Sequence, residues 1–233
     1  MSVSSTKAHA DLPPSSSDKW IYCHGWLALN RGLPNDCSAA AAEGTEAHEI
    51  LEAVLRGTLD LFTLKDNEMV DYLAPCAEWV SYQPGVIHPE LRMDFGSIFG
   101  FVDLFGTSDV VIDHPEHLTV ADLKYGMGLV EPEGNTQLLT YLSAAVDRFG
   151  PRKKYRLAIL QPRAYHPNGT IREWWLTHQE LEDFRVLLGE AISRNYNRGK
   201  PTAGDHCRKY CKAQGSCPAL ARYSLDIFRS TPE

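Results

Sequence analysis

Residues 106–124 read GTSDVVIDHPEHLTVADLK, two runs rich in β-branched residues joined by a short turn. Such runs are typical of strands, and the His-Pro-Glu turn at 114–116 predicts a hairpin. Side chains alternate along a strand, so Asp122 and Lys124 share one face of the second strand. The hairpin returns the chain so that Asp109, at the start of the first strand, comes close to Asp122.

Asp109 and Asp122 are candidate metal ligands. Two neighbouring carboxylates repel each other unless a cation lies between them, and oxygen ligands suit Mg²⁺ or Mn²⁺. A cation there would polarise a scissile phosphate, while Lys124 would orient the attacking water or neutralise developing charge. A surface hairpin with a solvated Asp-Lys pair is the alternative, because Asp-x-Lys alone is a common tripeptide.

The motifs around this hairpin occur in a definite order. Gly-x-x-Asp at 106–109 precedes Asp-x-Lys at 122–124, and Gln137 and Tyr141 follow one turn apart on a predicted helix. This order resembles the RecB-like branch of the PD-(D/E)xK nucleases. The resemblance implies an α/β fold with a restriction-endonuclease-like core, in which helices flank a mixed central β-sheet. It implies these catalytic residues: Asp109, Asp122, Lys124, Gln137 and Tyr141.

The same branch has an upstream helix that carries a metal-binding histidine. Residues 44–52, GTEAHEILE, match its Gly-x-x-x-His-x-x-Leu-Glu form, with His48 and Glu52 one turn apart. The resemblance implies a metal site formed by His48, Asp109, Asp122 and the backbone carbonyl of Leu123. Glu52 and Glu90 are expected to support this site.

Asp103 competes with Asp109 for the role of second carboxylate. Residues 100–103 also fit Gly-x-x-Asp. We prefer Asp109 because its strand directly precedes the strand of Asp122, whereas Asp103 lies one turn further back.

The spacing of the cysteines predicts a second metal centre. Cys207, Cys211 and Cys217 lie on a short basic tail, which indicates three thiolate ligands of a site that needs a fourth. Cys23 is the natural fourth ligand. In iron–sulfur members of the branch, such as the CRISPR-associated exonuclease and the AddAB nuclease, one cysteine precedes the core and three follow it. The resemblance therefore implies a 4Fe-4S cluster, with Zn²⁺ in the same site or free thiols as alternatives. Two cysteines show no partner spacing: Cys37 and Cys76.

Charge is unevenly distributed along the chain. The net charge is -7, yet residues 148–212 hold 14 basic against 6 acidic residues. Because phosphate binding needs local positive potential, this part is expected to contact DNA. Ordinary solvated faces are the alternative. The candidate phosphate contacts are Arg152, Lys153, Lys154, Arg163, Arg194 and Arg198. The candidate surfaces for base stacking are Trp20, Trp174 and Trp175.

Composition and periodicity predict one globular domain with appendages. Residues 1–14 are expected to form a flexible tail, 15–205 the nuclease domain, and 206–233 a cysteine-rich segment that completes the cluster site with Cys23. Helices are expected near 18–27, 43–56, 69–81, 135–149 and 178–198. Strands are expected at 86–95, 98–105, 109–113, 118–124, 155–161 and 171–175. No apolar run is long enough for a membrane span, and a cytoplasmic location is expected.

These features predict a metal-dependent deoxyribonuclease, in particular an exonuclease. Residues 17–23, SDKWIYC, resemble the opening of phage- and prophage-encoded members of the branch. The resemblance implies DNA as substrate, action in phage recombination or DNA end processing, and a single-strand annealing or other recombination protein as partner. The alternatives are a catalytically inactive DNA-end-binding module and a zinc-stapled adaptor of a recombination complex.

Overall fold

The computed structural model describes residues 10–34, 39–64, 67–207 and 211–230. Its centre is a five-stranded sheet in sequence order. The strands are β1 (Val86–Asp94), β2 (Phe105–His114), β3 (His117–Leu123), β4 (Lys154–Leu160) and β5 (Ile171–Thr177). Neighbouring strands are antiparallel except β3 and β4, which are parallel. The predicted mixed sheet is therefore confirmed.

Helices cover both faces of this sheet. The α-helices are α1 (Ser17–Trp20), α2 (Trp26–Asn30), α3 (Ala39–Leu55), α4 (Glu68–Ser81), α5 (Thr136–Phe149), α6 (His178–Tyr196) and α7 (Pro218–Ser230). Four short 3-10 turns accompany them: η1 (Pro14–Ser16), η2 (Leu61–Thr63), η3 (Ser97–Phe99) and η4 (Asp205–Cys207). None of the described helices is both long and apolar enough to cross a bilayer.

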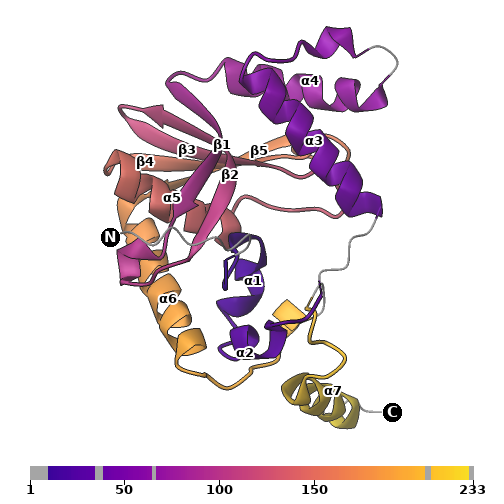
Figure 1. The fold of residues 1–233 in the computed structure, drawn as a ribbon, viewed down its shortest axis with the longest axis vertical. Helices are drawn as coiled ribbons and strands as arrows, with labels where there is room; N and C mark the ends of the chain where they lie inside the picture. The colour runs from indigo at the N-terminus through magenta and orange to yellow at the C-terminus, as the bar shows by residue number, and fades with distance from the viewer. Residues whose placement is uncertain (1–9, 35–38, 65–66, 208–210, 231–233) are drawn as a thin grey trace.

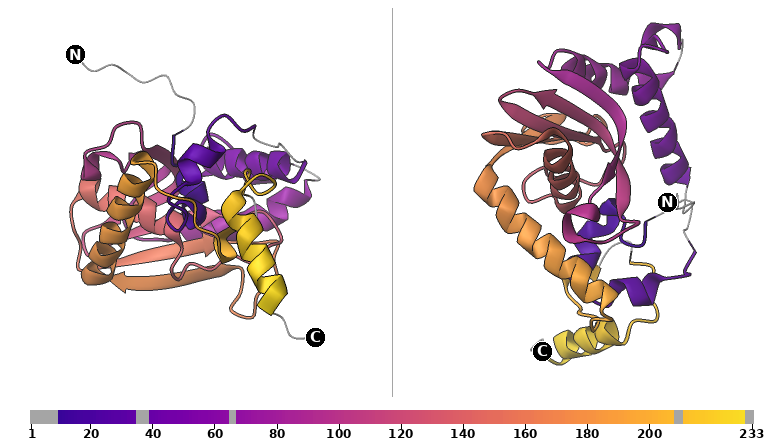
Figure 2. Two further views of the ribbon diagram at one scale, coloured as in Figure 1. Left: turned by 90° about the horizontal axis from the view of Figure 1, so that it is seen from below. Right: turned by 60° about the vertical axis from the view of Figure 1, so that its left-hand side comes forward.

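The hydrophobic core has two layers, one on each side of the sheet. Val120 and Leu157 belong to the layer that packs under α1, α2, α5 and α6. Ala121 and Leu123 belong to the layer that packs under α3 and α4. Figures 1 and 2 show the two groups of helices on opposite sides of the strands. Alternation along β3 thus sorts its residues between the faces as the sequence predicted.

Local capping fixes the two long helices behind the sheet. Asn135 begins α5 because its side chain accepts a hydrogen bond from the Leu138 amide at 3.1 Å. Gly150, with φ +84°, ends α5 and starts the turn into β4. Thr177 and Glu180 form a capping box at the start of α6. The helix α5 is the crossover between the parallel strands β3 and β4, so its position is tied to them.

The ladder between β1 and β2 is interrupted at one pair. Glu90 and Asp109 stand opposite each other in the register but do not pair, while the flanking pairs are regular. Glu90 has φ +46°, a left-handed conformation that non-glycine residues rarely adopt. Such strain persists where the surrounding structure holds it, and it often marks a functional position.

The interruption also changes which face the side chains of β2 occupy. Gly106 lies beneath Tyr141 of α5, whereas Val110 packs with α3 and α4 on the opposite face. In a regular strand both even-numbered positions would share one face. The two strands therefore switch faces at Glu90 and Asp109 without losing register.

Three sequence expectations are wrong. The strand expected at 98–105 is absent up to residue 104: this stretch holds η3 and a loop, because the Asp94 carboxylate accepts hydrogen bonds from the amides of Gly96 and Ser97 and turns the chain. The predicted tail is packed where it is described, since Leu12 is fully buried; residues 1–9 lie outside the described part. Trp20 cannot stack on bases, because it is fully buried against Phe95.

The contact between α5 and β2 explains the glycine of the Gly-x-x-Asp motif. A Cβ atom at position 106 would lie 2.9 Å from the Tyr141 ring and 2.8 Å from Pro14 Cγ. Glycine is therefore required at 106 by close approach and not by a turn.

We predict that Gly106→Ala destabilises the fold by about 1–3 kcal/mol, because its methyl group overpacks this contact. Gly44→Ala in α3 is the matched control: its Cβ would meet nothing within 4 Å, and alanine favours a helix by about 0.8–1.0 kcal/mol over glycine. Chemical denaturation of both variants measures the difference. Equal stability of the two variants would contradict this packing.

Candidate active site

Three carboxylates lie in one row across β1, β2 and β3. Val110 pairs with Ala121, so the same register places Asp109 opposite Asp122. Glu90 stands opposite Asp109 on the other side. Strands lie about 4.8 Å apart, so the backbone places the three acidic residues on neighbouring strands. The row ends at the C-terminal end of β3, directly before Lys124.

The tightest group of potential metal ligands is His48, Glu90 and Asp109, whose ligand atoms all lie within 4.8 Å of one another. His48 Nδ1 is 3.2 Å from Asp109 Oδ2. The same oxygen accepts a hydrogen bond of 2.7 Å from the Leu123 amide. The helix α3 therefore brings the His48 imidazole to Asp109 from one face of the sheet.

Asp122 takes part in a different contact, with α5 on the opposite face. Gln137 Nε2 donates to Asp122 Oδ1 at 2.8 Å, and Lys124 Nζ donates to Gln137 Oε1 at 2.9 Å. Lys124 Nζ also forms an ion pair of 2.7 Å with Asp122 Oδ2. Although this contact is short, Oδ2 has no hydrogen-bond donor of suitable geometry among the described residues. A buried carboxylate oxygen thus retains capacity for a further partner.

Burial and mutual repulsion shift the pKa values of the ionisable side chains in this row. Burial, with Asp109 nearby, raises the pKa of Glu90 to about 7. Burial likewise raises the pKa of Asp122, against the opposing effect of Lys124. Burial disfavours the charged form of His48, but hydrogen bonding to Asp109 and its charge raise the pKa overall. Carboxylates crowded in this way are stabilised by a cation, which is typical of functional sites.

The Lys124 ammonium stays close to both aspartates. Burial disfavours its charged form, yet the ion pair with Asp122 and the charge of Asp109 raise its pKa. An ammonium group has three donors, and Gln137 and Asp122 occupy two directions. One donor therefore remains for a substrate oxygen or a water.

A cavity of about 460 Å³ gives access to this arrangement. It is lined by Asp18, His48, Leu123, Lys124, Tyr125, Gly126, Gly128, Leu129, Val130 and Gln161. One imidazole and the carboxylate oxygens of Glu90 and Asp109 suit a hard divalent ion such as Mg²⁺ or Mn²⁺. The donor set therefore fits the metal that the sequence predicted, with Glu90 in a more central place than expected.

The remaining sequence candidates surround this centre. Tyr141 is buried over Gly106, and burial raises its pKa. Glu52 pairs with Arg56 at 2.7 Å and adds negative charge near Glu90. Asp103 lies in the loop before β2, near Tyr196 of α6. This placement separates Asp103 from the acidic row.

The four candidate cluster cysteines line one small cavity between α1, α2 and the C-terminal segment. Cys23, Cys207 and Cys217 are buried, and Cys211 is half-buried. Burial raises the pKa of the Cys23 thiol, with further contributions from Cys207 and Cys217. Among the described residues, no three of these sulfurs lie within 4.8 Å of one another. Cys76 is buried in α4, away from this cavity, and Cys37 lies outside the described residues.

The basic candidates lie in separate parts of the described chain. Arg152 forms an ion pair of 2.7 Å with Asp113 and donates to the His114 carbonyl, so it braces the β2–β3 hairpin. Lys154 Nζ lies 4.6 Å from the centre of the Trp175 ring. These contacts are at the hairpin end of the sheet, away from the acidic row.

The other basic candidates follow different elements. Arg163 pairs with Glu43 at 2.8 Å and lies over the Tyr125 ring, close to the candidate site. Arg194 pairs with Glu190 at 2.9 Å on α6. Two further candidates are exposed: Lys153 and Arg198. The basic candidates therefore lie around the two ends of β4 and at the C-terminal end of α6.

Two residues of the site escaped the sequence analysis. Gln161 lines the cavity and binds the loop that follows Lys124; its place at the end of a predicted strand was the available signal. Asp18 also lines the cavity, and its negative charge contributes to the raised pKa of Lys124. It resembles an ordinary helix-capping residue in sequence, so nothing there indicated a role at the site.

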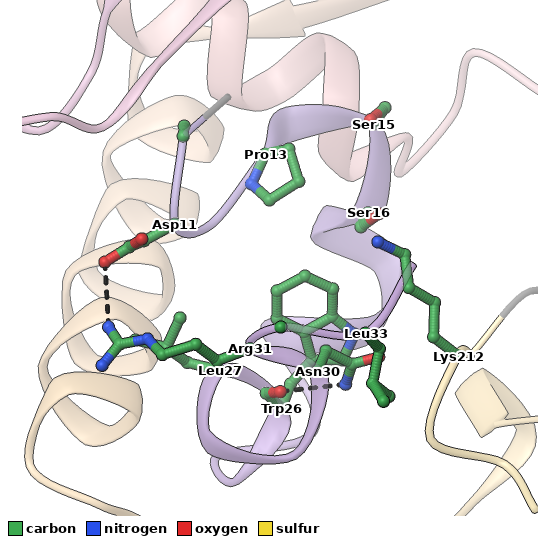
Figure 3. Close-up of a pocket in the computed structure, with 12 residues that line it drawn as sticks. Asp11, Pro13, Ser15, Ser16, Trp26, Leu27, Asn30, Arg31, Leu33 and Lys212 are labelled. Carbon is green, nitrogen blue, oxygen red and sulfur yellow. Dashed lines mark hydrogen bonds and ion pairs between the residues drawn. The ribbon is translucent and has the colours of Figure 1, made fainter. Parts of the chain in front are cut away.

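A second cavity, of about 490 Å³, lies between residues 10–16, α2 and Lys212 (Figure 3). Within it Arg31 pairs with Asp11 at 3.1 Å, and the Asn30 amide donates to the Trp26 carbonyl at 2.9 Å. None of the candidate catalytic residues lines this cavity. It is therefore separate from the candidate active site.

Comparison with known proteins identifies both a fold and a family. A crystal structure named a "putative exonuclease", from Eubacterium rectale, aligns with a TM-score of 0.54 and 10% identity, over 99% of this chain and 100% of that chain. An alkaline exonuclease from Laribacter hongkongensis aligns with a TM-score of 0.38 and 11% identity, over 92% and 93% of the two chains. The first similarity shows a shared fold. A family model described as "Protein of unknown function (DUF2800)" matches residues 9–231, and the chain therefore belongs to the DUF2800 family.

Proposed function

We propose that the chain is a divalent-metal-dependent DNA nuclease with a PD-(D/E)xK core. The observation that carries this proposal is the row of Glu90, Asp109 and Asp122, with His48 beside Glu90 and Asp109 and Lys124 beside Asp122. The fold shared with a protein named as an exonuclease candidate supports it. The intact acids, lysine and glutamine argue against an inactive DNA-end-binding module.

His48, Glu90 and Asp109 would hold a divalent ion, and we propose Asp122 as a further carboxylate ligand. When bound, the ion would supply Lewis-acid polarisation of the phosphate and would acidify a water molecule. The free donor of Lys124 would bind a phosphate oxygen where negative charge develops. Gln137 holds Lys124 and Asp122 together, so it positions both without needing to touch the substrate. Tyr141 fixes α5 on β2 and with it the place of Gln137.

We further propose that the enzyme cuts from DNA ends. It would act in recombination or DNA end processing, together with a recombination protein such as a single-strand annealing protein. The sequence resemblance supports this mode. Comparison of end-labelled linear DNA with closed circular DNA tests the cleavage mode. Degradation of linear DNA alone is expected, and equal cleavage of circular DNA would show that the protein is an endonuclease.

Asp122→Asn and Lys124→Ala should each lower the rate of DNA hydrolysis about 10²–10³-fold, the usual cost of removing one charge-stabilising group. The assay uses labelled linear DNA with Mg²⁺ or Mn²⁺, and a chelator should abolish cleavage. Asp147→Asn is the matched control, since Asp147 is an exposed carboxylate on α5, and it should retain full activity. Retention of activity in both site variants would reject this site.

Metal binding should also stabilise the fold, because the ion relieves repulsion within the row. At a metal concentration of about 100 times the dissociation constant, linkage gives about 2.7 kcal/mol. Thermal unfolding with and without Mn²⁺ measures this, and Asp109→Asn should lose the stabilisation while Asp147→Asn keeps it. An equal response of Asp109→Asn and the unaltered chain would place the ion elsewhere.

We also propose that Cys23, Cys207, Cys211 and Cys217 hold a 4Fe-4S cluster. Their shared cavity supports the assignment. Tetrahedral Zn²⁺ with bonds of about 2.3 Å needs thiolates roughly 3.8 Å apart, and the sulfurs of the described residues are not gathered so closely. The cluster would join α1 and α2 to the C-terminal segment.

Anaerobically purified protein should therefore be brown and contain iron and acid-labile sulfide. Cys217→Ser should lose both and unfold more readily, because a ligand is removed. Cys76→Ala is the control, since Cys76 lies in another core layer, and it should keep its iron. Colourless protein with stoichiometric zinc would show that the four cysteines form a structural zinc site instead.

A further inference from the structure

The loop that directly follows Lys124 exposes two large apolar side chains beside the candidate active site. Met127 is 66% exposed and Leu129 is 57% exposed. Leu129 lines the same cavity as His48 and Lys124. An isolated exposed apolar residue is ordinary, but a pair of them at the entrance to a polar site indicates a surface that something covers.

This loop is held in place by the side chain of Gln161, which is fully buried. Its amide nitrogen donates to the carbonyls of Gly126 and Gly128, at 3.0 and 2.8 Å. Its amide oxygen accepts from the Val130 amide at 3.2 Å. One buried side chain therefore binds the backbone at three points around Met127 and Leu129.

Arg172 of β5 strengthens the same attachment. Its guanidinium donates to Gln161 Oε1 at 2.7 Å and to the Val130 carbonyl at 2.5 Å. It is 5% exposed and lies 3.4 Å from a carboxylate oxygen of Glu131. A connected buried network of this kind fixes one conformation, because loss of any member leaves buried polar groups unpaired. The loop thus presents its apolar side chains from a fixed position.

Neither a phosphate nor a metal ion is a suitable partner for Met127 and Leu129, since both side chains lack polar hydrogen-bonding groups. The faces of nucleobases are suitable, and methionine and leucine are among the side chains that proteins insert between stacked bases. A nucleic acid whose scissile phosphate lies at Lys124 would bring the neighbouring nucleotide close to Leu129, because both residues line the same cavity.

We propose that Met127 and Leu129 form an apolar wedge that packs against the base next to the scissile phosphate and separates it from its pairing partner. This inference rests on the proposed nuclease function and adds a substrate preference to it. The wedge enables the site to act on duplex ends, because a strand must leave the duplex to enter a cavity of about 460 Å³.

The test uses the double substitution Met127→Ser with Leu129→Ser. Both side chains are exposed, so the variant is expected to fold. Phe62→Ser is the matched control, because Phe62 is 85% exposed on η2, next to α4 and outside the cavity. For the double variant, the ratio of duplex to single-strand cleavage should fall about tenfold, the size of one lost stacking contact. The control should keep the ratio of the unaltered chain.

A second measurement does not depend on cleavage. The Asp122→Asn background binds a duplex carrying 2-aminopurine next to its end, and unstacking of this base raises its fluorescence. The rise should occur with Asp122→Asn alone and with Phe62→Ser added, and should vanish with the double substitution although fluorescence anisotropy still reports bound duplex.

An unchanged cleavage ratio with a persistent fluorescence rise would overturn the wedge and leave the nuclease proposal intact. An unchanged ratio together with a loss of self-association would assign the loop to a contact between protein chains instead. If the unaltered chain cleaves no DNA, the nuclease proposal fails and the wedge fails with it.

Discussion

The repulsion among Glu90, Asp109 and Asp122 is the constraint on which the candidate site depends. The flanking strand pairs place Glu90, Asp109 and Asp122 next to one another on three neighbouring strands. Burial makes this proximity costly, since ionised groups interact more strongly away from water. His48 offsets part of the charge at Asp109, and Lys124 offsets part at Asp122. A divalent ion is the simplest partner for what remains.

The architecture brings the compensating groups in from both faces of the sheet. The helix α3 delivers His48 from one face, and α5 delivers Gln137 from the other. This is possible because β1 and β2 change faces at Glu90 and Asp109. The short helix α1 connects the candidate site with the cysteine cavity: Lys19 lines the cysteine cavity and donates to Asp18 at 2.8 Å, and Asp18 lines the cavity beside Lys124.

Much of the site could be predicted because its geometry follows from local periodicity. Alternation along residues 120–124 places Asp122 and Lys124 together, a hairpin turn brings back Asp109, and helical spacing presents Gln137. The role of Glu90 could not be predicted, since its left-handed backbone and the change of face depend on pairing between distant segments. The 98–105 stretch has strand-like composition, but the Asp94 side chain turns the backbone there. The spatial distribution of the basic residues could not be predicted either, because residues that are close in sequence lie at opposite ends of β4 and at the C-terminal end of α6.

The most direct test of the account is the location of Mn²⁺ by anomalous diffraction from a crystal of the unaltered protein soaked in the metal. We expect an anomalous peak bounded by His48, Glu90 and Asp109, about 2.0–2.2 Å from its ligand atoms, as for other small divalent ions. Ordered side chains in this row without a peak, or a peak at another place, would contradict the claim that these carboxylates are gathered to hold a metal.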